Sequence, residues 1–161
     1  MKRIICVAMT LMLLFALCAC GTVATNQDVK DVKLDLGQIM TEIESSVTLP
    51  ENMDDITNSE LLLDYYGINA EDVKSFAVKF NGTGIKCDEI IMIEAASDEA
   101  LEKISTALNN RLEDVKNQMN NYLPDEYEIA SKCKVETAGN YVVLFISPDA
   151  QRMTEIFKSK F

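Results

Sequence analysis

The side chains that could do chemistry in this chain are cysteines, carboxylates and a tyrosine pair, because its 161 residues include no histidine. Without imidazole, the Ser-His-Asp and Cys-His forms of nucleophilic catalysis are excluded, and so are zinc sites that use histidine. The chain also lacks an imidazole proton shuttle for neutral pH. We therefore expect no catalytic residues, no metal site and no cofactor, and we expect that the protein is not an enzyme.

Two adjacent carboxylates, Asp88 and Glu89, stand at the start of an otherwise apolar strand. Paired carboxylates can do acid–base work when burial pushes their pKa values apart. Neighbouring residues of a strand point to opposite faces, however, so these two would not share one site. We interpret them as solvated charges at a strand end.

An acidic tract runs from Leu34 to Val73, with ten Asp or Glu residues and no Lys or Arg. Such a face could bind a basic partner or divalent cations. The spacing around Asp54-Asp55 nevertheless lacks the register of a calcium-binding loop. We interpret the tract as a solvated face of the domain.

Two further pairs of residues are candidates for a site. Tyr65 and Tyr66 could form an aromatic platform for a sugar or a peptide, although we favour one packed ring and one exposed ring. Cys87 and Cys133 could form a disulfide in an exported protein or serve as small core residues. Neither thiol has the basic surroundings of an activated nucleophile.

The thiol of Cys20 differs from these because it ends an apolar N-terminal run. Lys2 and Arg3 give a positive start, and residues 4–19 follow with only Thr10 as a polar interruption. This layout is typical of a secretory signal peptide. The run is shorter than the roughly 20 residues that span the hydrocarbon of a membrane as a helix, although an uncleaved membrane helix is the alternative.

The residues Leu17-Cys18-Ala19-Cys20-Gly21 resemble the bacterial lipobox, in which a signal peptidase cuts before a cysteine that carries diacylglycerol. The resemblance implies cleavage after Ala19 and lipid attachment at Cys20, with membrane lipid as the partner. Each buried CH₂ group contributes about 0.8 kcal/mol, so two or three acyl chains anchor a protein firmly. We therefore expect a signal peptide at residues 1–19, a lipidated cysteine and short tether at 20–33, and one domain at 34–161. That domain would lie at the extracytoplasmic face of the cell membrane.

The net charge of −11 excludes two kinds of partner. Nucleic-acid binding requires a basic footprint, and electrostatic binding to a bilayer requires clustered Lys or Arg. We expect neither, so attachment to the membrane should depend on lipid alone.

The hydrophobic pattern predicts one α+β domain. Apolar residues recur with a helical period in four segments, and they alternate or run continuously in four others. The predicted helices cover about residues 36–47, 57–66, 97–123 and 148–157, and the predicted strands cover about 75–80, 89–95, 132–136 and 141–146.

The two predicted hairpins should form a four-stranded antiparallel sheet. The long helix between them acts as a crossover and should be right-handed, so the fourth strand lies between the second and third, in the order 1-2-4-3. We expect the long helix, with a core stripe from Leu101 to Tyr122, to share one face with the C-terminal helix. The two N-terminal helices should cover the other face as its least stable layer, since the acidic segment 48–56 links them. An opened layer would expose an apolar groove for a partner.

Three short motifs carry a second resemblance: Asp88-Glu89-Ile90, Tyr122-x-Pro124 and Gly139-Asn140-Tyr141-Val142-Val143. With them, residues 36–157 resemble an uncharacterised family of lipoproteins from clostridia-like Gram-positive bacteria, the domain-of-unknown-function family 4358. The resemblance implies a surface lipoprotein with a two-hairpin fold. It assigns no catalytic residues.

We consider three classes of function. The first, which we expect, is a non-catalytic binding or accessory module of the cell envelope, with an envelope protein or peptide as a candidate partner. The second is a solute-binding component of a transport system, whose two-lobed closing cleft needs far more chain than this. The third is a small enzyme that works without histidine.

Overall fold

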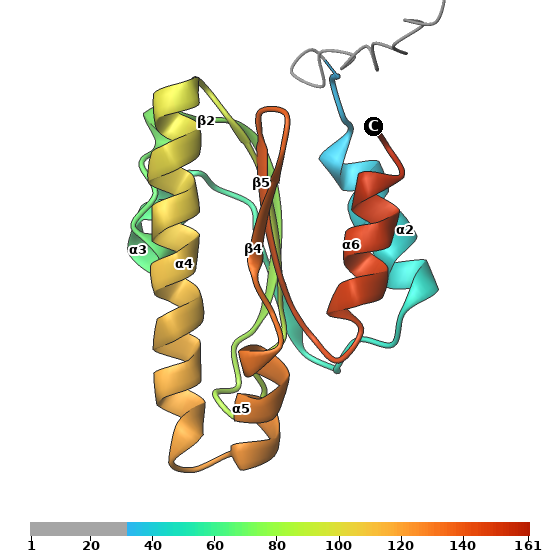
Figure 1. Ribbon diagram of the computed structural model, residues 1–161, viewed down its shortest axis with the longest axis vertical. Helices are drawn as coiled ribbons and strands as arrows, with labels where there is room; N and C mark the ends of the chain where they lie inside the picture. The colour runs from blue at the N-terminus through green and yellow to red at the C-terminus, as the bar shows by residue number, and fades with distance from the viewer. Residues whose placement is uncertain (1–31) are drawn as a thin grey trace, which may run out of the picture.

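The computed structural model describes residues 32–161. The predicted signal peptide, the lipid site at Cys20 and most of the tether lie outside the described residues. The described part is an α+β structure in which helices pack on both faces of one antiparallel sheet (Figure 1). Its helices are α2 (Leu36–Ser46), α3 (Glu60–Tyr66), α4 (Asp98–Asn120), α5 (Pro124–Ser131) and α6 (Ala150–Lys158), with a 3-10 turn η2 (Ala70–Asp72); its strands are β1 (Met53–Ile56), β2 (Val73–Asn81), β3 (Glu89–Ala95), β4 (Val135–Ala138) and β5 (Tyr141–Ile146).

The sheet contains the predicted four strands in the predicted order, and a fifth strand extends it. Its order is β1-β2-β3-β5-β4, and every neighbouring pair is antiparallel. The two strands that are apolar on both faces, β3 and β5, lie next to each other in the interior of the sheet, with Ile91 opposite Leu144. The expected sheet of four strands is therefore corrected to five.

The added strand, β1, forms in the segment that the sequence predicts to be a linker. Only Ile56 of its four residues is buried, whereas Asp54 and Asp55 are exposed. A strand without apolar alternation gives no periodic signal. It forms because the outer edge of β2 offers unpaired backbone groups, and Ile56 pairs with Val78 there.

The helices cover the two faces differently from the prediction. Alternate residues of β3 separate two cores: Ile91 and Ile93 pack in the core that includes α3 and α4, and Ile90 and Met92 pack in the core of α2 and α6. Figure 1 shows α4 and α6 on opposite sides of the sheet. The prediction that the long and C-terminal helices share one face is wrong, and only α2 of the two N-terminal helices covers the other face.

The position of α6 follows from its short connection. Three residues, 147–149, separate the end of β5 from the start of α6, so the helix folds straight back onto the nearest uncovered apolar surface. Since α4 already covers one face of β5, that surface is the opposite face, where Phe145 packs with Phe157.

The long helix α4 begins as predicted, because the Ser97 hydroxyl accepts a hydrogen bond of 3.1 Å from the Ala100 N–H and so caps the helix. Its buried stripe ends at Met119, however, and Tyr122 is 84% exposed. Pro124 does not simply end this helix. It opens α5, where proline suits the first turn and Asp125 suits the positive helix end.

The first described residues are held against the sheet by one side chain. The Tyr141 hydroxyl accepts a hydrogen bond of 2.9 Å from the Leu34 N–H and donates one of 3.2 Å to the Val32 carbonyl. The Tyr141 ring also lies edge-on to Phe161 at 5.9 Å between centroids. The two ends of the described chain therefore meet at one end of the sheet (Figure 1).

Candidate functional site

The strongest candidate for a binding site is a groove between α3 and α4, which we call the α3–α4 groove. It has a volume of about 320 Å³. α3 ends at Gly67, which adopts the left-handed conformation (φ 68°) that ends helices, and α4 supplies the facing wall. The groove is lined by Tyr65, Tyr66, Gly67, Ala107, Asn110, Arg111 and Asp114.

The guanidinium of Arg111 is fixed from behind by a buried carboxylate of β3. Arg111 Nε lies 3.1 and 3.2 Å from the two carboxylate oxygens of Glu89, and Arg111 Nη2 donates to the same carboxylate. Glu89 is 5% exposed in its side chain and Arg111 is 26% exposed. Burial raises the pKa of Glu89, and the ion pair with Arg111 opposes this rise. A two-pronged pair of this kind fixes the orientation of the guanidinium plane.

Tyr66 forms the inner wall beneath Arg111. The guanidinium carbon of Arg111 lies 5.6 Å from the centre of the Tyr66 ring, within the range of a cation–π contact. Burial raises the pKa of the Tyr66 hydroxyl, with Glu89 adding to the rise. This hydroxyl is buried and makes no hydrogen bond within the part of the chain that the structure describes. Buried polar groups normally have a partner, so the unsatisfied hydroxyl marks this wall of the groove as unusual.

Tyr65 forms the open side of the groove. Its side chain is 46% exposed, and its ring packs against Phe80 at 5.0 Å and against Tyr66 at 6.4 Å between centroids. The prediction of one packed and one exposed tyrosine is confirmed. The exposed ring is held in place by its neighbours, so it offers a flat apolar surface beside the polar side chains of Asn110 and Arg111.

The side chains that line the α3–α4 groove are suited to forming hydrogen bonds with a bound molecule. Asn110 and Asp114 provide an amide and a carboxylate, and Arg111 Nη1 makes no hydrogen bond to the described residues. A ring stacked on Tyr65 could therefore exchange hydrogen bonds with both donors and acceptors. Few well-placed polar groups beside an aromatic surface are typical of a ligand site.

The structure corrects our interpretation of Asp88 and Glu89. Both are buried, at 4% exposure each, and are not solvated strand-end charges. They do point to different surroundings, since Glu89 pairs with Arg111 and Asp88 interacts with Ser147. Burial raises the pKa of Asp88, and the nearby Glu126 raises it further. Only Glu89 contributes to the groove, and it does so indirectly.

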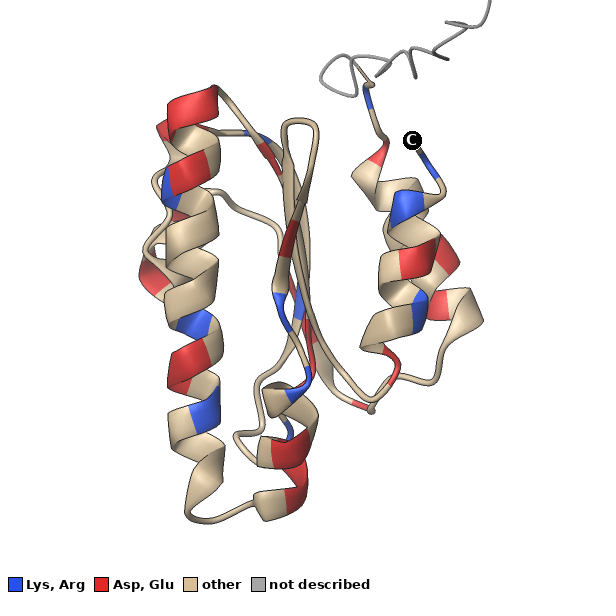
Figure 2. Ribbon diagram, in the orientation of Figure 1, with Lys and Arg blue, Asp and Glu red and all other residues tan. Residues whose placement is uncertain are grey.

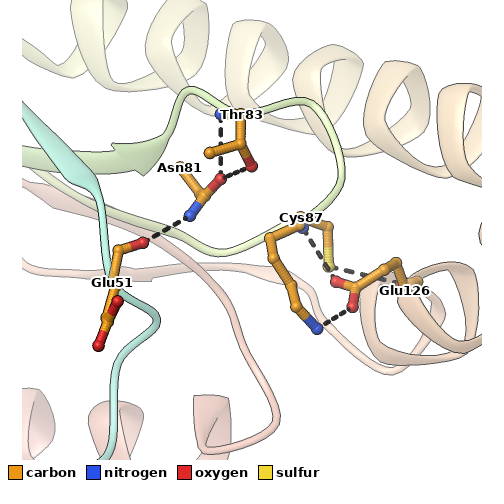
Figure 3. Close-up of polar contacts among 6 residues, drawn as sticks. Glu51, Asn81, Thr83, Cys87 and Glu126 are labelled. Carbon is orange, nitrogen blue, oxygen red and sulfur yellow. Dashed lines mark hydrogen bonds and ion pairs between the residues drawn. The ribbon is translucent and has the colours of Figure 1, made fainter.

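Cys87 lies in a second polar cluster that joins the β2–β3 loop to α5 (Figure 3). The Glu126 carboxylate accepts hydrogen bonds from the Cys87 N–H at 3.0 Å and from Lys86 Nζ at 2.6 Å. The thiol points to the Glu126 carbonyl at 3.5 Å, and burial raises its pKa. A buried thiol with a raised pKa is a poor nucleophile, so this cluster fixes the loop.

Cys133 is also a buried free thiol, and it does not form a disulfide with Cys87. Most of the acidic tract is exposed, but Asp72 is buried and lies 3.5 Å from Lys103 of α4. Among residues 32–161, no cluster of potential metal ligands occurs. The same residues contain no helix with the length and apolarity needed to cross a membrane.

Sequence reasoning found Tyr65 and Tyr66 but missed the polar wall on α4. Asn110, Arg111 and Asp114 are polar residues on a long amphipathic helix, a pattern that equally describes any solvated helix face. Nothing in their spacing signals that Arg111 reaches a carboxylate of β3. The pairing appears only once α4 is packed on the sheet.

Comparison with known proteins gives a family but no characterised relative. No curated protein and no solved structure matches the chain. A family model described as "Domain of unknown function (DUF4358)" matches residues 45–147. The matched span includes all five strands and both walls of the α3–α4 groove, and it leaves out α6. The chain therefore belongs to the DUF4358 family.

Proposed function

We propose that this protein is a lipid-anchored, extracytoplasmic binding module that holds a sugar-containing ligand in the α3–α4 groove without changing it chemically. The observation that carries the proposal is the placement of the exposed Tyr65 ring beside Arg111, whose guanidinium is oriented by the buried Glu89. The apolar face of a sugar ring stacks on an aromatic side chain, and its hydroxyls bond to planar polar groups such as Asn, Asp and Arg.

The N-terminal sequence supports the anchor. A basic start, an apolar run and the lipobox-like residues around Cys20 agree with one another. Eleven residues lie between Cys20 and Val32, so even a fully extended chain would keep the domain within about 40 Å of the membrane. Under this proposal, the end of the sheet where Tyr141 forms hydrogen bonds with residues 32 and 34 would face the membrane.

The anchor is tested by lipid labelling. Cells that express the full chain are fed an alkyne-tagged palmitate analogue, and label and detergent partitioning are measured for wild type, Cys20→Ser and Cys18→Ser. We expect label in wild type and in Cys18→Ser, and loss of label in Cys20→Ser. A processed Cys20→Ser protein that partitions into detergent as wild type does would contradict the anchor.

The ligand class is tested separately by calorimetry on the full chain in detergent micelles, with soluble oligomers of N-acetylglucosamine as the probe. We expect Tyr65→Ala to weaken binding about tenfold, the scale of losing an aromatic anchor. Tyr122→Ala is the matched control, because Tyr122 is exposed but lies outside the groove. Equal affinity for wild type and Tyr65→Ala, or equal losses in both variants, would refute the proposed site.

A further inference from the structure

A second groove lies on the opposite face of the sheet, between the edge strand β4 and α6, and we call it the β4–α6 groove. Its volume is about 450 Å³. One wall is β4 with the residues that precede it, the other wall is α6, and Phe145 of β5 lies between them. The groove is lined by Lys132, Cys133, Lys134, Glu136, Phe145, Ala150, Gln151, Thr154, Glu155 and Lys158.

The lining of the β4–α6 groove carries three lysines and two glutamates, so the groove is slightly basic in an acidic protein. Residues 132–161 carry five Lys or Arg and three Asp or Glu, whereas residues 34–73 carry ten acids and no basic residue. The chain as a whole has a net charge of −11. Figure 2 shows basic positions on α6 and beside the start of β4. A local excess of positive charge attracts segments of negative charge.

Two lysines in the groove already hold a carboxylate. Lys134 Nζ lies 3.1 Å from Glu136 Oε1, and Lys158 Nζ contacts the other carboxylate oxygen of the same residue. The side chains of Lys134 and Lys158 are 77% and 50% exposed, so each keeps donors that face solvent. The hydrogen bond from Lys158 lowers the pKa of Glu136, and Lys134 adds to this. Glu136 thus shows that a carboxylate fits between these two lysines.

The backbone of β4 favours an extended occupant. Among residues 32–161, β4 pairs only with β5 in the sheet, so within this part of the chain the N–H and C=O groups of its other edge have no strand partner. An extended peptide can add to such an edge, and side-chain pockets then select its residues. Lys134, which directly precedes β4, and Glu136 are two positions apart and their side chains contact each other, and this spacing is the repeat of alternate side chains in an extended peptide.

We propose that the β4–α6 groove binds an extended acidic peptide segment of a partner protein, which adds to the edge of β4 and places a carboxylate at Lys134 and Lys158. Glu136 then acts as an internal competitor, because it occupies the position that the carboxylate of the partner would take. This inference does not depend on the α3–α4 groove or on the sugar ligand.

The test uses the full chain in detergent micelles and a fluorescent peptide that alternates Glu and Val, with fluorescence anisotropy as the readout. We expect Lys134→Gln and Lys158→Gln each to weaken binding about two- to fivefold, the range of exposed ion pairs. Glu136→Gln should tighten binding by a similar factor, because it releases both lysines. Added salt should weaken binding to wild type. Lys103→Gln is the matched control, since Lys103 lies on α4 on the other face of the sheet.

The sign of the Glu136→Gln effect separates this proposal from a merely structural role, in which loss of Glu136 would weaken binding or leave it unchanged. Thermal unfolding followed by circular dichroism verifies that each variant is folded. The proposal is overturned if a peptide that alternates Gln and Val binds equally well. It is also overturned if phosphatidylglycerol vesicles compete for the same lysines, or if the groove is occupied by a second copy of the chain.

Discussion

The two faces of the sheet bury different kinds of side chain. The core beneath α2 and α6 is aliphatic and aromatic, and its rings pack edge-on, as Phe157 does against Tyr141 and Phe145. The face beneath α3, α4 and α5 also buries carboxylates, at Glu89 and Glu126, and the unpartnered hydroxyl of Tyr66. Both faces use their apolar area to stabilise the fold, but among residues 32–161 the buried carboxylates Glu89 and Glu126 both lie on the face of α4 and α5.

This difference is consistent with the site that we propose. A buried ion pair is rarely a gain in stability, because desolvation offsets most of the attraction between the charges. A well-packed apolar pair could stabilise the same position as the Glu89–Arg111 pair does. We therefore infer that this pair serves the α3–α4 groove, where Arg111 is presented to solvent.

The largest expected effect comes from breaking this pair on one side. Arg111→Met leaves Glu89 buried without a partner, and we expect it to lower the free energy of unfolding by about 3–5 kcal/mol. Combining it with Glu89→Leu should recover most of the loss, while ligand binding stays absent. Urea unfolding measures both variants. A double variant as unstable as the single one would show that the pair serves stability rather than the groove.

The apolar part of the same face should respond to truncation of α4. Leu108 is fully buried, so Leu108→Ala should cost about 2–5 kcal/mol, as buried leucine truncations do. Glu99→Ala and Asn117→Ala alter exposed positions of the same helix and should cost well under 1 kcal/mol. Similar losses at all three positions would show that the buried face of α4 is assigned incorrectly.

A smaller, pH-dependent effect is expected at Glu126. Burial would raise its pKa, but the hydrogen bonds from Lys86 and from Cys87 lower it below its usual value. A lowered pKa means that Glu126 stabilises the fold above the pKa of about 4.3 of an unfolded glutamate and stops doing so as the pH falls through its folded value. Glu126→Gln should cost about 1–2 kcal/mol at pH 7, allowing for the solvent around Lys86.

The cost of Glu126→Gln should shrink as the pH is lowered from about 5 to about 3, which urea unfolding across this range measures. Glu128→Gln is the control, because Glu128 is an exposed residue of the same helix that pairs with Lys132. This variant should leave both the free energy of unfolding and its dependence on pH nearly unchanged. A cost that stays constant with pH would show that the charge of Glu126 does not stabilise the loop.

The sequence predicted the elements whose hydrophobic pattern is unambiguous. β3 and β5 are apolar on both faces and α4 has a stripe of several turns, so their positions and the order of the two hairpins are confirmed. β1 was missed because Asp54 and Asp55 break any alternation, and α5 was missed because Pro124 directly follows the predicted long helix at about 97–123, where a proline also fits the end of a helix. Both elements depend on their neighbours more than on their own pattern.

The arrangement of the layers and the composition of the site were harder to predict, because both depend on how the elements pack together. Which face α6 covers depends on the three-residue connection after β5, and a hydrophobic pattern does not contain that information. Tyr65 and Tyr66 were found because adjacent aromatics are visible in the sequence. The partnership of Arg111 with Glu89 was not, since it joins residues 22 positions apart on a helix and a strand.

The central claim, that the α3–α4 groove is the ligand site, is tested most directly by NMR. The ¹⁵N-labelled full chain in detergent micelles is titrated with oligomers of N-acetylglucosamine, and backbone and arginine Nε signals are followed. We predict shifts at Tyr65, Gly67 and Asn110 and at the side chain of Arg111, with no shifts along α6. An absence of shifts, or shifts confined to residues outside the groove, would contradict the account.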